Sequence, residues 1–239
     1  IRDRHFFERY KDKDIQPGTS FLNQCRTEYT RCYTAIPELP LSNIWMAKEL
    51  APSLPENSVF HLGILTSLRS WDFFEVSKSI HSACNVGGFG TDGMLSSLLG
   101  ASIIHPQKLY FGIVGDLAFF YDMNALWNGH IRSNLRIVVL NNGGGAIFHA
   151  LPGLDMAGDT RRFVTASHGA SAAGWAESQG FTYLRATDAV SLLAALDDLL
   201  DEAATAPVLL EVFTDAETDA EEQRNYYHVI KEEWKNFLR

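Results

Sequence analysis

The sequence has few cysteines and no long apolar run, and each absence argues against a class of protein. Its three cysteines, Cys25, Cys32 and Cys84, are odd in number and show no C-x-x-C spacing, which argues against a disulfide framework or a zinc site. They are interpreted as ordinary thiols of a cytoplasmic protein, because disulfides are rare in that reducing compartment. No run of about 18 apolar residues occurs, so no membrane span and no membrane partner are expected.

Basic residues are also scarce relative to acidic ones. The 239 residues contain 20 lysines and arginines against 29 aspartates and glutamates, which gives a formal net charge of -9. Non-specific binding to nucleic acid depends on basic side chains that neutralise phosphates, so no nucleic-acid partner is expected. With 46% hydrophobic residues the chain can bury a sizeable core, and its length suits one large domain with an extension.

The pattern of apolar residues predicts the fold class. Short runs rich in Val, Ile and Leu, which predict strands, alternate with helical patterns; the strands are expected at 58–63, 79–85, 108–115, 135–142, 181–186 and 207–213. This alternation predicts an α/β fold, with a parallel sheet of about six strands and helices on both faces. One of the expected helices covers 166–180, a stretch of small residues that ends at a glycine.

Three regions are expected along the chain. Residues 1–38 are charged and irregular, and they are interpreted as a linker or the tail of an upstream domain. Residues 39–215 carry the alternating pattern and form the predicted domain. Residues 216–239 are predicted to form a C-terminal helix, because apolar side chains recur there at three- and four-residue spacing.

Polar side chains follow two of the predicted strands. Asp116 comes directly after one buried strand, and Asn141 and Asn142 end the next. Such groups are costly to bury without partners, and the carboxyl ends of parallel strands meet at one edge of a sheet, where ligands bind. A carboxylate, an amide and loop carbonyls are oxygen ligands that suit Mg²⁺, which completes its shell with phosphate and water. The glycines at 143–145 would let backbone approach a ligand closely. Ordinary turns, in which Asp and Asn are common, are the alternative interpretation.

The spacing of these residues resembles a known signature. GDLAFFYDMNAL (115–126) is followed by IVVLNNGGGAIF (137–148), and Asn142 comes 26 residues after Asp116. Gly-Asp, then a helix and a strand, then Asn-Asn is similar to the signature of thiamine diphosphate enzymes. Leu117, the residues YD-x-NAL and the closing G-G-x-I-F resemble the menaquinone-pathway synthases (SEPHCHC synthases) within that group. The resemblance covers roughly residues 40–215.

The resemblance implies a set of site residues. Asp116 and Asn142 would bind Mg²⁺ or Mn²⁺ through their side chains, and Gly144 through its carbonyl. Thiamine diphosphate would contact a set of residues around the ends of these strands: Gly90, Thr91, Gly115, Asp116, Leu117, Ala118, Asn142, Gly144, Ala146, Ile147 and Phe148. The catalytic residue that activates the cofactor, a glutamate, would come from a pyrimidine-binding domain that this sequence does not contain.

The resemblance also implies an activity and partners. The chain would be the cofactor-binding part of a longer enzyme, a transferase that decarboxylates 2-oxoglutarate and adds the product to isochorismate in menaquinone biosynthesis. Alone it would be inactive, because the pyrimidine-binding domain comes from another subunit of a homo-oligomer. Val86 and Trp71 stand where the family has substrate-binding arginines, and Arg69 is a possible replacement. A thiamine diphosphate enzyme acting on another 2-oxo acid and a non-catalytic binding domain of the same fold remain alternatives.

Overall fold

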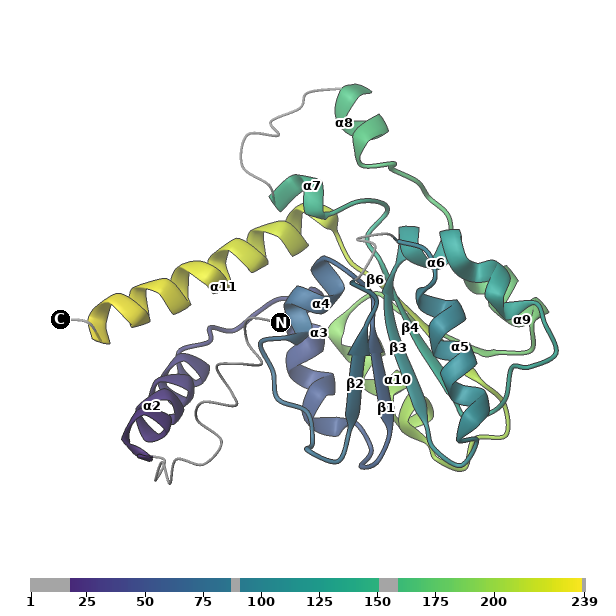
Figure 1. Cartoon of the computed structure of the whole chain (residues 1–239). Helices are drawn as coiled ribbons and strands as arrows, with labels where there is room; N and C mark the ends of the chain where they lie inside the picture. The colour runs from purple at the N-terminus through teal and green to yellow at the C-terminus, as the bar shows by residue number, and fades with distance from the viewer. Residues whose placement is uncertain (1–17, 87–90, 151–158, 238–239) are drawn as a thin grey trace, which may run out of the picture. The chain divides into compact units, whose positions relative to one another are not determined.

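The computed structural model describes residues 18–86, 91–150 and 159–237. They form a parallel sheet with helices on both faces, which confirms the predicted fold class (Figure 1). The sheet has six strands in the order β2-β1-β3-β4-β6-β5, and every neighbouring pair is parallel. The strands are β1 (Val59–Leu62), β2 (His81–Cys84), β3 (Tyr110–Gly115), β4 (Leu135–Asn141), β5 (Thr182–Ala186) and β6 (Val208–Phe213).

The central strands are buried along nearly their whole length. β4 is buried at all of its positions, and β3 and β6 at all but their last residue. A parallel sheet covered on both faces requires apolar side chains at successive positions, which explains the continuous Val, Ile and Leu runs in the sequence. The carboxyl ends of β3 and β4 therefore emerge side by side at one edge, with Gly115 opposite Leu140.

Helices cover the two faces of the sheet. The helices of α-type are α2 (Ser20–Thr34), α3 (Asn43–Leu50), α4 (Thr66–Trp71), α5 (Met94–Ile104), α6 (Asp116–Asp122), α7 (Ile147–Ala150), α8 (Asp159–Val164), α9 (Ala173–Ser178), α10 (Ala189–Leu200) and α11 (Ala216–Phe237). Two 3-10 helices, η1 (Ala51–Ser53) and η2 (Met123–Leu126), follow α3 and α6. α5, α6 and α9 lie on one face of the sheet, and α4 and α10 lie on the other (Figure 1).

The described chain divides into two compact units. One consists of Glu38–Asn225 and contains the whole sheet. The other combines α2 with the C-terminal half of α11, where Arg31 Nε lies 3.4 Å from Glu233 Oε2. The sequence interpretation of 1–38 as a linker did not foresee α2, whose weakly apolar, charged composition gave no clear helical stripe. The predicted boundaries at 38 and 215 stay a prediction.

One predicted helix is shorter than expected. Residues 166–172 are not helical, and α9 begins only at Ala173. Ala166 has a positive φ of 51°, and His168 N–H donates to the carbonyl of Gly143 at 3.0 Å. The small residues of this stretch therefore form a loop against the end of β4. Within the three described ranges, no helix is both long and apolar enough to cross a membrane.

A buried arginine joins the sheet to α10. The Arg136 side chain on β4 is fully buried, and burial lowers its pKa. Its Nε donates to the carbonyl of Leu199 at 2.9 Å and its terminal nitrogens to those of Asp201, Leu135 and Ser133. The last carbonyls of a helix have no partners within the helix, so Arg136 satisfies part of the C-terminal end of α10.

Replacing Arg136 with methionine is therefore expected to lower the free energy of unfolding by about 2–4 kcal/mol, because buried carbonyls lose their donors. Denaturant unfolding of the Arg136→Met variant measures this. Arg132→Met is the control, since Arg132 is exposed in the preceding loop. Equal stability of the two variants would contradict the structural role of Arg136.

Candidate functional site

A cavity of about 190 Å³ lies at the carboxyl edge of the sheet. It is bounded by the segments that follow β1, β3 and β4, which is where a parallel sheet binds its ligands. Most of its walls are apolar, and polar groups are confined to a few positions. The lining residues are Asn43, Ile64, Leu65, Thr66, Ser67, Thr91, Gly115, Asp116, Leu117, Ala118, Leu140, Asn142, Gly144, Gly145, Ala146, Ile147 and Phe148.

Asp116 provides the carboxylate of this cavity. It is the first residue of α6, directly after β3, and its side chain is almost fully buried. Oδ1 accepts from the backbone N–H of Leu117 at 2.7 Å, and Oδ2 accepts from that of Gly144 at 2.9 Å. The second bond links the end of β3 to the loop after β4. Burial raises the pKa of Asp116, while these N–H donors and nearby His168 act in the opposite direction.

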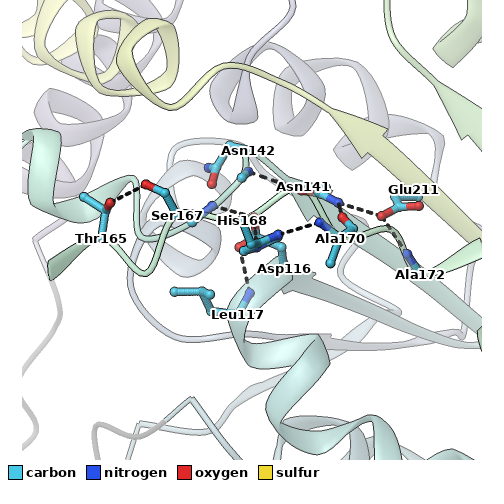
Figure 2. Close-up of polar contacts among 12 residues, drawn as sticks. Asp116, Leu117, Asn141, Asn142, Thr165, Ser167, His168, Ala170, Ala172 and Glu211 are labelled. Atoms are coloured by element: carbon cyan, nitrogen blue, oxygen red, sulfur yellow. Dashed lines mark hydrogen bonds and ion pairs between the residues drawn. The ribbon is translucent and has the colours of Figure 1, made fainter. Parts of the chain in front are cut away.

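His168 approaches the same carboxylate from the loop before α9. Its Nε2 lies 3.3 Å from Oδ2 of Asp116 (Figure 2). Its ring contacts that of Phe120 edge to face. Nδ1 of His168 accepts from the backbone N–H of Ala170 at 3.1 Å. Because Nδ1 acts as an acceptor, the neutral ring carries its proton on Nε2, facing Asp116. Sequence analysis did not assign His168 a role.

The side chains of the two asparagines at the end of β4 make different contacts. Asn141 is buried, and its Nδ2 donates to Glu211 Oε1 at 2.7 Å and to the carbonyl of Ala170 at 2.9 Å (Figure 2). Its Oδ1 accepts from the N–H of Gly143 at 3.2 Å. Asn141 therefore uses its whole amide to hold the two loops together, and it does not line the cavity.

Glu211 is the buried anchor of that arrangement. It lies on β6 and is fully buried. Oε1 accepts from Asn141 and from the N–H of Ala172 at 2.9 Å, while Oε2 accepts from Ser171 Oγ at 2.6 Å and Tyr183 OH at 2.7 Å. Burial and the bond to Glu211 raise the pKa of Tyr183 to about 12, so its hydroxyl stays a donor at neutral pH.

Asn142, in contrast, lines the cavity. Its Nδ2 donates to Asp219 Oδ2 at 3.1 Å, and Asp219 is itself buried near the start of α11. Among the residues that the structure describes, Oδ1 of Asn142 is buried and has no hydrogen-bond donor. Burial raises the pKa of Asp219, against the effect of donors from Thr214, Asn43 and Asn142. The amide oxygen of Asn142 is thus an unused acceptor beside the cavity.

Gly144 requires the absence of a side chain. Its φ is +149°, and a Cβ added there would lie 2.6 Å from the carbonyl oxygen of Thr165. The N–H of Gly145 donates to that same carbonyl at 2.7 Å. The loop after β4 is therefore pressed against the segment before His168, and only glycine fits at this position.

Hydrogen bonds connect β1 to Asn85 and Gly93, which precede α5. His61, which is buried on β1, makes a 2.7 Å hydrogen bond through Nε2 to Asn85 Oδ1. Asn85 Nδ2 donates to the carbonyl of Gly93 at 2.9 Å and to Ser97 Oγ at 3.1 Å. Burial lowers the pKa of His61. These contacts hold Asn85 and Gly93 in place, and Thr91, two residues before Gly93, lines the cavity.

The cavity brings together the residues that the sequence selected at this edge. Thr91, Gly115, Leu117, Ala118 and Ala146 line it, as do Asp116, Asn142, Gly144, Ile147 and Phe148. Gly90 lies outside the described residues. The assignment of these residues to cofactor and metal stays a prediction.

Sequence reasoning missed one wall of the cavity. This wall consists of Asn43 and the segment 64–67, which follows β1 and includes the first two residues of α4. Leu65 has a positive φ of 66°, which is unusual for a bulky side chain and is often found at functional sites. The carboxyl end of β1 faces the same edge as those of β3 and β4, and this rule could have directed attention to 64–67.

The residues discussed for substrate binding lie elsewhere. Trp71 is buried in the core, with its ring centroid 4.7 Å from that of Phe60. Arg69 and Val86 are exposed, and neither belongs to the cavity lining. Arg69 is nevertheless on α4, whose first residues, Thr66 and Ser67, do line it.

The acidic ligands of the site are few. Across residues 18–86, 91–150 and 159–237, no group of three or more His, Cys, Asp and Glu side chains is arranged to hold a metal. One carboxylate, one amide oxygen and backbone carbonyls remain as donors. Such a set suits a hard cation whose remaining ligands come from water or phosphate oxygens.

Comparison with known families identifies the matching domain. The sequence profile described as "Thiamine pyrophosphate enzyme, C-terminal TPP binding domain" matches residues 66–212. This segment includes β2 to β5, all of β6 but its last residue, and most of the cavity lining.

Individual relatives are similar over most of the chain. The 2-succinyl-5-enolpyruvyl-6-hydroxy-3-cyclohexene-1-carboxylate synthase of Bacteroides fragilis is 45% identical over 196 residues, which is 82% of this chain and 35% of that protein. The enzymes of the same name from Bacteroides thetaiotaomicron and Phocaeicola vulgatus are 44% identical over 197 residues and 42% over 210. These alignments cover 82% and 87% of this chain, but 35% and 36% of the relatives. The chain thus spans about a third of the length of these relatives.

The Glu211 anchor leads to a stability prediction. In Glu211→Leu, the buried donors of Asn141 and Ala172 lose their acceptor, so the free energy of unfolding should fall by about 3–5 kcal/mol. Amide hydrogen exchange at Gly143 and Ala172 should also become faster. Glu217→Leu is the control, because Glu217 is exposed and forms a surface ion pair with Arg161. This variant should lose less than about 1 kcal/mol of stability. A Glu211→Leu variant as stable as this control would refute the anchoring role.

Proposed function

The chain belongs to the thiamine pyrophosphate enzymes, as their C-terminal TPP-binding domain, and on that premise we propose that its cavity binds thiamine diphosphate together with Mg²⁺. The observation that carries this proposal is the buried, undonated Oδ1 of Asn142, which lines the same cavity as Asp116 and Gly144. A buried acceptor without a donor is costly, and a cation would remove that cost.

The proposed donor set fits a small hard cation. Among the described residues that line the cavity, Asp116 supplies the only carboxylate, Asn142 an amide oxygen and Gly144 a backbone carbonyl. The Gly144 carbonyl accepts from the N–H of Ala146 at 3.1 Å, which leaves its second lone pair for a metal. With one full charge from the protein, Mg²⁺ would need the diphosphate to complete its neutralisation, so metal and cofactor should bind together. Mn²⁺, which prefers similar ligands, is expected to substitute.

The remaining lining residues would position the cofactor and exclude water. Gly115 has open space where a Cβ would be, so backbone at the end of β3 can be approached closely. The backbone of Leu117 and Ala118 at the start of α6 lies beside it, where N–H groups favour an anion. Ile147 and Phe148 give an apolar wall. Thiamine diphosphate, when bound, supplies the electron sink that decarboxylation of a 2-oxo acid requires.

We further propose an activity for the full protein, as a synthase of the kind that the relatives' name gives. The full protein would decarboxylate 2-oxoglutarate and transfer the product to isochorismate, as a cytoplasmic transferase of menaquinone biosynthesis. This proposal rests on 42–45% identity to synthases of that name. The activating glutamate would come from a pyrimidine-binding domain of another subunit, so a homo-oligomer is required and the 239-residue chain alone would be inactive.

A related enzyme with another 2-oxo acid is the second candidate. It is favoured by one observation: Val86 and Trp71, at which the sequence resemblance implies arginines, carry no charge and do not line the cavity. A non-catalytic binding domain is the third candidate. Cofactor binding without turnover in the full protein would favour it over both enzymes.

Replacement of the carboxylate tests the metal site. Asp116→Asn keeps the size of the side chain but removes its charge, so Mg²⁺-dependent binding of thiamine diphosphate should weaken by at least about 100-fold, corresponding to roughly 3 kcal/mol. Calorimetric titration of the protein with cofactor, at fixed Mg²⁺ and with Mg²⁺ removed by chelation, measures this.

The matched control is Asp197→Asn, on the exposed side of α10. It should leave the affinity unchanged. If Asp116→Asn binds the cofactor as tightly as this control, then Asp116 is not a metal ligand.

Arg69 is the test of substrate class. If it replaces the missing family arginines, Arg69→Ala should reduce kcat/KM for 2-oxoglutarate plus isochorismate by about 10- to 100-fold, the effect of losing one charge-assisted contact to a carboxylate. Steady-state kinetics of the full protein measures it, and Arg132→Ala, in the exposed loop before β4, is the control. Absence of turnover with this pair, alongside turnover of another 2-oxo acid, would favour the second candidate.

A further inference from the structure

The amide of Asn142 has two ends of opposite character. Its oxygen can accept a hydrogen bond or bind a cation, whereas its NH₂ can only donate. A rotation of 180° about the last side-chain bond would exchange the two at little steric cost. A site that uses the oxygen therefore needs a neighbouring group that hydrogen-bonds to the NH₂ and not to the oxygen.

Asp219 is the neighbour that contacts the NH₂ end. Its Oδ2 lies 3.1 Å from Asn142 Nδ2 and also accepts from Thr214 Oγ1 at 2.7 Å. Its Oδ1 accepts from the backbone N–H of Asn43 at 2.8 Å, at the start of α3. Three donors point at this carboxylate, so both of its oxygens act as acceptors. It can pair with the NH₂ of Asn142 but not with the oxygen.

We propose that Asp219 is a positioning residue that fixes the orientation of the Asn142 amide, so that Oδ1 is presented to the cation of the cavity. The inference rests on the proposed function, because it concerns how the chain prepares its metal site. Asp219 itself does not line the cavity; it acts through Asn142.

Asp219 lies on α11, outside residues 66–212 that match the family profile. It is 77 residues away from Asn142 along the chain. Asn43, whose N–H it accepts, precedes the matched segment and lines the cavity. Segments from both sides of the matched region therefore meet at one carboxylate and act on one amide.

An exchange of the two side chains tests the orientation. In Asp219→Asn, the new NH₂ would face the NH₂ of Asn142; the Asn142 amide should then turn to accept, and present NH₂ to the cation. The Mg²⁺ concentration needed for half-maximal thiamine diphosphate binding should rise about 10- to 100-fold, as is typical when an outer partner of a metal ligand is lost.

In Asn142→Asp/Asp219→Asn, the NH₂ of residue 219 donates to a carboxylate that presents oxygen from either end. Affinity for Mg²⁺ should return to within about threefold of the original.

The control uses a nearby carboxylate directly before the same helix, α11. Asp215 accepts from the N–H of Thr218 at 2.8 Å and is exposed. Asp215→Asn should leave the Mg²⁺ requirement unchanged. In Asn142→Asp/Asp215→Asn the new carboxylate would face the intact Asp219, so the affinity for Mg²⁺ should stay below that of the unmodified protein. Titrations use the full protein, with Mg²⁺ and thiamine diphosphate as the probes and cofactor binding, not turnover, as the readout.

A measurement on the unmodified protein covers the case in which Asp219→Asn does not fold. The side-chain NH₂ protons of Asn142 should exchange with solvent at least about tenfold more slowly than those of exposed Asn124, because Asp219 holds them. This is followed by NMR without metal.

The proposed orientation of the Asn142 amide is supported if the Mg²⁺ requirement rises in Asp219→Asn and returns in Asn142→Asp/Asp219→Asn. An unchanged Mg²⁺ requirement in Asp219→Asn, a loss that the exchanged pair does not recover, or rapid exchange of the Asn142 NH₂ protons overturns it. If the unmodified protein binds no thiamine diphosphate while its Asn142 NH₂ protons are protected, the proposed function fails and the contact between Asp219 and Asn142 stands.

Discussion

Three buried carboxylates dominate the structure around the cavity. Asp116, Glu211 and Asp219 are each almost fully shielded from water. An ionised carboxylate can remain buried only where hydrogen-bond donors surround it. Here many of the donors are backbone N–H groups and amides of the two loops that follow β4 and precede α9. Satisfying these charges therefore fixes the shape of the loops, and the loops shape the cavity.

The sequence was sufficient to predict the sheet and the edge of the sheet at which the cavity lies. Continuous apolar runs such as the one ending at Gly115 are typical of strands covered on both faces, and the structure confirms a strand there. Chain order then placed Asp116 and Asn142 at the same edge, because parallel strands end together. The family profile confirms the resemblance on which the cofactor was predicted.

Contacts between distant segments could not be predicted in this way. Glu211 is a single acidic residue within an apolar strand, and its four donors come from three separate segments. The division of labour between Asn141 and Asn142 follows from which neighbour each amide meets, and adjacent identical residues carry no local signal of it. The expected helix over 166–180 was wrong at its start for the same reason: the loop there is held by Gly143 and Glu211, and small side chains permit either conformation.

The position of Asp219 has a consequence for how such domains are inherited and recombined. The segment that matches the family profile is shorter than the part of the chain that shapes the cavity. β1 and Asn43 precede this segment, and Asp219 follows it. A chimera joined at the limits of the motif would transfer every predicted ligand, yet would leave the orientation of one of them to the recipient. Compatibility between donor and recipient would then be decided by residues that a motif comparison does not inspect.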